Sequence, residues 1–168
     1  FDTARTRTAY ERIISDFEKG KTQILIGTQM LSKGLDFGNV SVVGILSADS
    51  LMNFPDFRAH ERAYQLMVQV SGRAGRRDKR GTVILQTTQP EHPLIRMVQH
   101  FAYKEMVSLQ LSERSMFRYP PYYRLIVLIL RSRNEEALQE MSALYAEKLR
   151  ARLGERVLGP VTPPITRV

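Results

Sequence analysis

Apolar side chains recur with helical spacing near the start and the middle of the chain. Between Thr8 and Lys19 they form one stripe, which predicts an amphipathic helix. Thr8 and Glu11 have the spacing of a capping box at the start of that helix, and Gly20 supplies a stop at its end. A second stripe, over residues 57–70, predicts another helix.

Short apolar runs with no polar alternation lie between these helices. The three runs cover residues 23–28, 41–48 and 81–87, and the second has Val-Val-Gly-Ile-Leu at its centre. Runs of this length without alternation are typical of strands buried on both faces. Strands of this kind alternating with helices predict an α/β layer with a mostly parallel sheet.

The pattern changes after Gln89-Pro90. Helical segments are predicted over residues 93–115, and the proline-rich turn 119–123 follows them. A strand over residues 124–131 leads to a long helix with Asn134 as its cap, and Val157–Val161 is predicted to be one more strand. We therefore expect a small, incomplete α+β unit in this part of the chain.

These elements predict three parts. Residues 1–90 are expected to form the α/β lobe, residues 91–118 a helical linker segment, and residues 119–168 the start of a truncated C-terminal α+β domain. The sequence begins with Phe1 rather than Met, so we interpret it as part of a longer protein.

Composition narrows the function classes. The 168 residues include 25 Lys or Arg against 17 Asp or Glu, a net charge of +8, which favours a polyanionic partner. Cysteine is absent, which excludes disulfides and thiolate metal sites from this sequence, and the three histidines are too scattered to predict a metal site. No apolar run approaches the roughly 20 residues of a membrane span, so a soluble protein is expected.

One phosphate-binding motif is only apparent. Gly20-Lys21-Thr22 spells the end of a P-loop, but Ser15 stands where the required glycine would be, and a helix precedes the tripeptide instead of a strand. We interpret it as a helix stop. Since no other P-loop or acidic Mg²⁺-binding box occurs, the chain alone is expected to be inactive.

The strongest candidate site is a glycine-arginine segment, residues 69–76, with the sequence Gln-Val-Ser-Gly-Arg-Ala-Gly-Arg. Gly72 and Gly75 allow close approach of a ligand to the backbone. Arg73 and Arg76 are three residues apart on one turn, and guanidinium pairs suit phosphate because they donate bidentate, charge-assisted hydrogen bonds. The alternative is a basic surface turn.

A second candidate lies in the loop after the first predicted strand, residues 28–37. Thr28 and Lys33 are placed to hold a phosphate of a nucleic-acid backbone, and Asp36 to reach a ribose hydroxyl or orient a water molecule. Taken alone, this loop fits a simple polar connection better.

The two segments together, in this order and about forty residues apart, resemble motifs V and VI of superfamily 2 helicases. The intervening sequence, from Asp49 through Phe54-Pro55-Asp56-Phe57-Arg58 and Glu61-Arg62 to Gln69, is similar to the PriA family of bacterial replication-restart helicases (primosomal protein N′). The chain departs from the general motif at Val70, where that motif has Arg, so no role is assigned to Val70.

The resemblance implies a RecA-like second motor lobe and a set of site residues. Arg73 and Arg76 would be arginine fingers that act on ATP held by the first lobe. Gly34, Asp36, Gln69, Gly72 and Gly75 would line the ATP cleft. Thr28, Gln29 and Lys33 would lie near the DNA backbone.

The resemblance also implies the cofactors and partners. ATP and Mg²⁺ would bind between two lobes, and structural zinc would be held by cysteines outside this sequence. The protein would translocate 3′ to 5′ on single-stranded DNA, unwind forked DNA, and work with single-stranded DNA-binding protein and other primosome proteins in a bacterial, nucleoid-associated cytoplasmic setting.

Two alternatives remain at this stage. Another superfamily 2 repair or fork-remodelling translocase would share both motifs but should lack the Asp56-Phe57-Arg58 and Glu61-Arg62 pattern. A non-catalytic DNA-binding module would tolerate loss of both motif arginines.

Overall fold

The computed structural model describes residues 6–27, 40–75 and 81–162, arranged as two compact units, Phe1–Arg124 and Leu125–Val168. We describe each unit by itself. The first unit runs beyond the boundary expected near residue 90, because the helices that follow this position pack into the same core as those before it.

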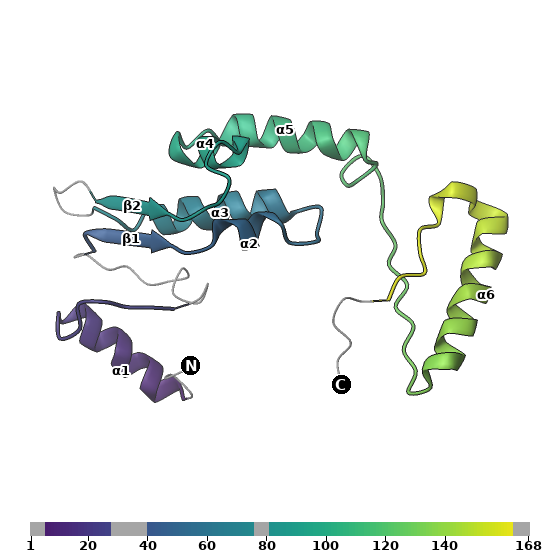
Figure 1. Cartoon of the computed structure of the whole chain (residues 1–168), viewed down its shortest axis with the longest axis horizontal. Coiled ribbons are helices and arrows are strands. Elements are labelled where there is room, and N and C mark those ends of the chain that lie inside the picture. The colour runs from purple at the N-terminus through teal and green to yellow at the C-terminus, as the bar shows by residue number, and fades with distance from the viewer. Residues whose placement is uncertain (1–5, 28–39, 76–80, 163–168) are drawn as a thin grey trace. The chain divides into compact units, whose positions relative to one another are not determined.

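The first helix, α1, spans Arg7–Glu18 and confirms the predicted amphipathic helix (Figure 1). The predicted capping box is wrong. The cap is Thr6, whose hydroxyl oxygen accepts the amide hydrogen of Ala9 at 3.2 Å, while Thr8 lies inside the helix. Gly20 has a φ of +72° just past the helix end, so the apparent P-loop tripeptide is indeed a helix stop.

The first unit contains a two-stranded parallel sheet. Strand β1 (Val42–Ile45) pairs with β2 (Thr82–Leu85), and Val42 lies opposite Thr82 (Figure 1). Parallel pairing of these two predicted strands is confirmed. The predicted strand over residues 23–28 is wrong for residues 23–27, which are irregular and pair with neither described strand, since a strand forms only where a neighbour takes up its backbone hydrogen bonds.

Two helices connect the strands. Helix α2 (Ala48–Met52) follows β1 directly and was not predicted, because five residues are too few to show helical periodicity. Helix α3 (Ala59–Ser71) confirms the predicted helix over residues 57–70 and runs back along the sheet. Parallel strands need a crossover connection of about a dozen residues or more, and the segment that contains α2 and α3 is long enough to provide it.

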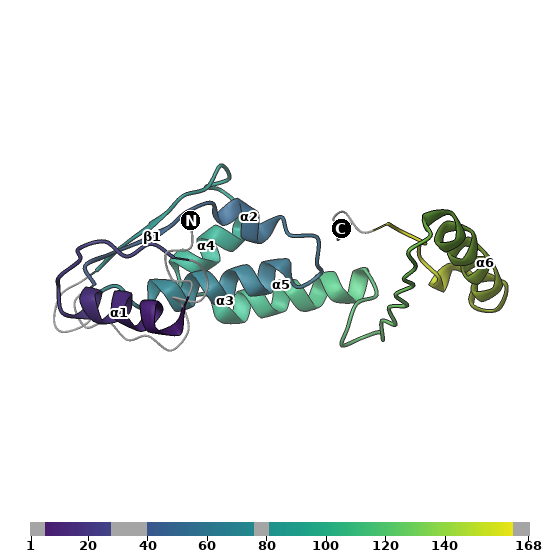
Figure 2. The same ribbon diagram turned by 90° about the horizontal axis from the view of Figure 1, so that it is seen from below.

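Helices α4 (Pro93–Gln99) and α5 (Tyr103–Met116) confirm the helical segments predicted over residues 93–115. Both contact α3, and Figure 2 shows α5 running alongside it. The segment expected to be a linker therefore has its own buried face.

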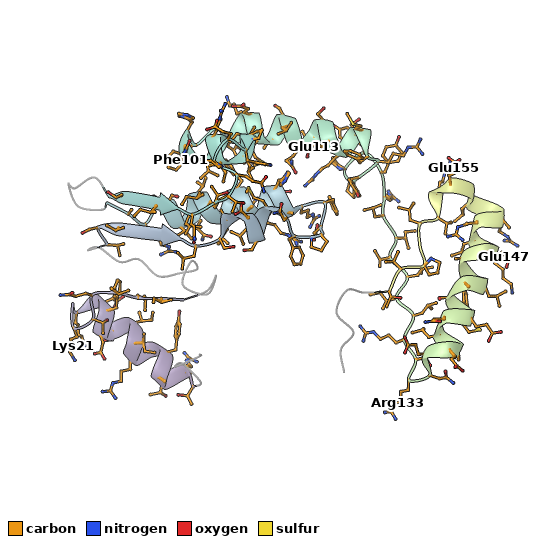
Figure 3. The ribbon with its side chains drawn as sticks, viewed as in Figure 1. Lys21, Phe101, Glu113, Arg133, Glu147 and Glu155 are labelled. Atoms are coloured by element: carbon orange, nitrogen blue, oxygen red, sulfur yellow. The ribbon has the colours of Figure 1, made fainter. Side chains whose placement is uncertain are left out.

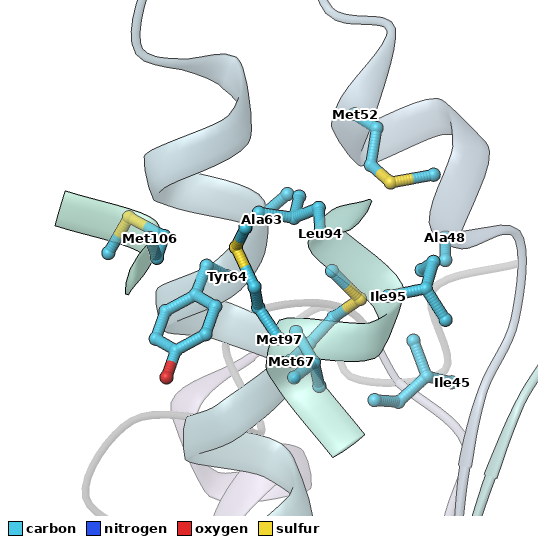
Figure 4. Packing of buried hydrophobic residues seen from close by; sticks show 11 residues of the cluster. Ile45, Ala48, Met52, Ala63, Tyr64, Met67, Leu94, Ile95, Met97 and Met106 are labelled. Carbon is cyan, nitrogen blue, oxygen red and sulfur yellow. The ribbon is translucent and has the colours of Figure 1, made fainter. Parts of the chain in front are cut away.

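The core of the first unit is rich in methionine. It is built from one strand and four helices, and Met67 on α3 is fully buried at its centre (Figure 4). Flexible thioether side chains fill irregular gaps between small residues such as Ala48 and Ala63. The buried members are Ile45, Ala48, Met52, Ala63, Tyr64, Met67, Leu94, Ile95, Met97, Val98 and Met106.

A polar and aromatic cluster also joins α5 to α3. Arg114 of α5 forms an ion pair with Glu61 of α3 and lies over the ring of Phe57, 5.2 Å from its centroid. The same ring stacks on Tyr119 at a centroid distance of 4.9 Å. Arg114 is only 15% exposed, so this ion pair is largely shielded from water.

The second unit contains one long helix, α6 (Glu135–Leu153). Its cap is confirmed, because the Asn134 side-chain oxygen accepts the amide hydrogen of Ala137 at 3.1 Å. Arg133 lies at the bend before the helix (Figure 3). The predicted strands over residues 124–131 and 157–161 are wrong as far as the structure describes them, since both segments are extended or irregular without strand pairing. The apolar residues Leu125 to Leu130 are consequently exposed.

Candidate functional site

At the carboxyl edge of the sheet, Asp49 forms hydrogen bonds with the residues that follow β2. Its carboxylate accepts the hydroxyl hydrogen of Thr87 at 2.6 Å, and the amide of Thr88 at 2.8 Å together with its hydroxyl at 3.1 Å. These hydrogen bonds, that of the Thr87 hydroxyl first, hold the pKa of Asp49 below its ordinary value. The contacts join the start of α2 to the residues that follow β2.

The opposite, amino edge of the sheet carries the glycine-arginine segment. Helix α3 ends at Ser71, whose hydroxyl donates to the Met67 carbonyl at 2.7 Å. The amides of Gly72 and Arg73 donate to the last carbonyls of the helix, at 3.0 and 3.1 Å. These bonds continue the helical direction into the turn Gly72–Gly75, so the orientation of the turn is set by α3.

The far end of that turn is fixed to the chain that enters β1. The amide of Gly75 donates to the carbonyl of Val40 at 3.1 Å. Gly75 has a φ of +84°, a left-handed conformation that glycine adopts without steric cost. Val40 lies three residues after the second candidate segment, so a backbone hydrogen bond connects the chain just beyond that segment to the turn of the first.

The turn is also in close contact with Gly81, the residue before β2. A Cβ atom at position 81 would collide with the backbone of Ala74 and Gly75 and would lie 2.6 Å from the Ala74 Cβ. The amide of Thr82 then donates to the Ser41 carbonyl at 2.9 Å, which begins the pairing of the two strands. The residues on either side of segment 76–80 are thus held together at the sheet edge.

Four of the predicted site residues lie within the part of the chain that the structure describes. Gln69 is exposed on the last turn of α3, and Gly72, Arg73 and Gly75 lie in the turn itself. The other six predicted site residues, Thr28, Gln29, Lys33, Gly34, Asp36 and Arg76, lie outside the described residues.

The chemistry of the described turn fits a phosphate group of a nucleotide. Arg73 is half-buried, and its guanidinium group can donate bidentate hydrogen bonds to a phosphate. The chain has no cysteine, so it offers no thiolate ligand for zinc. Among the residues that the structure describes, no cluster of three or more His, Asp or Glu side chains could bind a metal ion.

Sequence reasoning missed two structural roles at this site. It used Asp49 only as part of a resemblance, and it gave Gly81 no role. Both act through residues far away in the sequence or across a turn, so no local pattern reveals them. The signal that was available is positional, since Asp49 directly follows one predicted strand and Gly81 begins another.

No helix in the described parts of the chain is long and apolar enough to span a membrane.

His92, the N-cap residue of α4, faces His60 of α3 in an edge-to-face arrangement with ring centroids 5.3 Å apart. Burial, and then His60, lower the pKa of His92.

Comparison with known proteins extends over nearly the whole chain. Residues 1–78 match the family described as helicase conserved C-terminal domain, and residues 115–168 match the primosomal protein N C-terminal domain. The chain is 41% identical to the replication restart protein PriA of Synechocystis sp. over 99% of its own length, and 44% identical to that of Bacillus subtilis over 99%. It is 36% identical to PriA of Haemophilus influenzae over 99%. It spans only 20%, 21% and 23% of these three relatives, respectively.

Proposed function

This chain belongs to the PriA family of replication restart proteins and carries part of a helicase C-terminal domain, and from that premise we propose that its glycine-arginine segment completes the ATP-hydrolysing site of a DNA helicase. The segment would supply arginine fingers to a nucleotide held mainly by another lobe. Arg76 is assigned to the γ-phosphate and Arg73 to a supporting position.

The observation that carries this proposal is the way the turn is held. Its first residues extend α3, its last residue is bonded to Val40, and Gly81 closes it from the other side. A basic loop that only attracts a polyanion needs no such constraint, because a flexible arginine neutralises charge equally well. An arginine that stabilises a transferring phosphoryl group must instead be held in place before the reaction.

The main contribution of this chain would be to stabilise the negative charge on the phosphoryl group during its transfer. When bound, ATP with Mg²⁺ supplies the phosphoryl group whose transfer to water drives the motor. The guanidinium groups of Arg73 and Arg76 would neutralise the negative charge that grows on that group, and Gly72 and Gly75 would let them come close. Gln69, Gly34 and Asp36 would line the same cleft.

The link between Gly75 and Val40 supports a connection between this chemistry and DNA. In our proposal, Thr28, Gln29 and Lys33 contact the DNA backbone, and the bond to Val40 passes their displacement to the arginines. We extend the proposal to 3′-to-5′ translocation on single-stranded DNA, unwinding of forked DNA, and cooperation with single-stranded DNA-binding protein and primosome-loading proteins.

The test is ATP hydrolysis stimulated by single-stranded DNA, measured with the full-length protein. Arg76→Ala is expected to reduce turnover by about a thousandfold, within the range known for arginine fingers, with nucleotide and DNA binding nearly intact. Arg76→Lys keeps the charge but loses the bidentate geometry, so it should restore only part of the activity. Arg12→Ala, on the exposed face of α1, is the matched control.

The other outcomes separate the alternatives. Unchanged turnover in Arg76→Ala excludes the finger assignment. Loss of DNA affinity in that variant, in proportion to the loss of turnover, would assign Arg76 to DNA contact, whereas a non-catalytic DNA-binding module predicts that DNA affinity survives the change.

A further inference from the structure

Gly81 occupies a position where glycine is required by space and not by backbone conformation. Its φ lies outside the positive range that disfavours other residues, so alanine can adopt its backbone angles. The obstacle is the neighbouring turn. A Cβ atom at position 81 would overlap the backbone of Ala74 and Gly75, and backbone atoms, unlike the end of a long side chain, have nowhere to rotate.

This contact bears directly on the candidate site. Ala74 and Gly75 stand between Arg73 and Arg76 in the sequence, so any atom that displaces them displaces the chain that carries both arginines. The same turn has one other fixed point, the hydrogen bond from Gly75 to Val40. A side chain at position 81 therefore has to move the turn, stretch that bond, or do both.

We propose that Gly81 is a positioning residue of the motor: its lack of a side chain sets where the glycine-arginine turn lies against the amino edge of the sheet. The proposal rests on the function proposed above. Gly81 touches no substrate and acts only through the turn. Its effect is on the rate of hydrolysis, because a small displacement of a transition-state group lowers turnover while ground-state binding persists.

A matched control exists in the neighbouring strand. Gly44 lies in β1, paired with Ile84, and a Cβ atom there would meet nothing within 4 Å. Gly44→Ala in β1 and Gly81→Ala directly before β2 are thus the same chemical change at two neighbouring parts of the sheet, and they differ in what the new methyl group meets.

The experiment measures kcat and KM for DNA-stimulated ATP hydrolysis by the full-length protein, with DNA affinity and circular dichroism in parallel. Gly81→Ala is expected to lower kcat by about tenfold or more, with KM and DNA affinity within about twofold of wild type. Gly44→Ala is expected to keep all three values. Equal kcat in the two variants overturns the proposal.

A double-mutant cycle tests whether Gly81 acts through the arginines. In an Arg76→Ala background, Gly81→Ala should cause little further loss, because the group that it positions is gone. A further loss of the same factor as in wild type shows a general structural effect and overturns the proposal. Unchanged turnover in Arg76→Ala alone rejects the finger assignment instead, so the two failures are distinguishable.

A second variant covers the case in which Gly81→Ala does not fold. Ala74→Gly removes the methyl group on the other side of the contact and introduces no clash. It loosens the same turn, so kcat should fall severalfold with KM unchanged. Wild-type kcat in Ala74→Gly, together with an unfolded Gly81→Ala protein, overturns the proposal.

Discussion

Asp49 and Thr87 stand 38 residues apart in the sequence, yet the Thr87 hydroxyl donates a hydrogen bond of 2.6 Å to the Asp49 carboxylate. This bond joins the start of α2 to the residues that follow β2. Together with the bonds from Thr88, it holds the carboxyl edge of the sheet closed and keeps Asp49 ionised.

Asp49→Asn is expected to destabilise the sheet at neutral pH and to remove a pH dependence. The folded-state pKa of Asp49 is lowered from an ordinary value of 3.8, so its contribution to stability is fully present above pH 3.8 and is lost as the pH falls through the folded-state value. The difference in urea midpoint between wild type and Asp49→Asn should therefore shrink on acidification below pH 4. A constant difference down to pH 2 would contradict this assignment.

His92 gives a second pH dependence, in a higher range. Its Nδ1 accepts the amide hydrogen of Leu94 at 3.1 Å, which only the neutral ring can do, and burial followed by the neighbouring His60 lowers its pKa, while Glu113 and Asp49 act in the opposite direction. The neutral form is favoured in the folded state. The stabilisation is thus complete above the ordinary value of 6.5 and is lost as the pH falls below it.

His92→Asn provides the control for this titration. Asparagine keeps a side-chain acceptor at the start of α4 but does not ionise. Between pH 7.5 and 5 the wild-type urea midpoint should decrease more than that of His92→Asn. Parallel decreases would assign the acid sensitivity to another group.

Two ion pairs of the first unit should differ in energetic weight. The side chains of Arg114 and Glu61 are 15% and 33% exposed, and Arg114 also contacts Phe57. Arg114→Ala should therefore lower the free energy of unfolding by roughly 1–3 kcal/mol, because a charged, part-buried hydrogen bond is lost. Arg96 and Glu91 are 62% and 79% exposed, and Arg96→Ala should cost about 0–1 kcal/mol. Urea unfolding of both variants checks the order, and equal losses would contradict it.

The fully buried Met67 offers a test of the core. Met67→Ala should cost about 2–5 kcal/mol, because it leaves a cavity between α3 and its neighbours. Met116 is 72% exposed at the end of α5, and Met116→Ala should change stability by less than about 0.5 kcal/mol. The comparison of urea midpoints isolates burial from the chemistry of the methionine side chain.

Sequence patterns predicted those elements whose signals are local. The apolar stripes of α1 and α3 and the Asn134 cap of α6 follow from local spacing. The parallel pairing of β1 with β2 follows from the alternation of apolar runs with helices along the chain. The predicted strands failed over residues 23–27 and 124–131 for one reason. An apolar run indicates a strand only if a neighbour pairs with it, and no pattern within the run reports on that neighbour.

The candidate site divides in the same way. The glycines and arginines of residues 69–76 could be predicted as site residues because they are close together in the sequence. The contact of Gly81 with Gly75 and the bond from Gly75 to Val40 depend on how α3 returns along the sheet, which is a property of the folded chain.

The exposed run from Leu125 to Leu130 has a consequence for handling the protein. Its six residues are all apolar, 42% to 86% exposed, and contain neither proline nor glycine. An unpaired extended backbone with such side chains is a template for intermolecular β-pairing, and Arg124 and Arg131 place charge only at the two ends of the run. The 168-residue chain in isolation should therefore aggregate in proportion to its concentration, and a lysine in place of Val127 should raise its solubility limit.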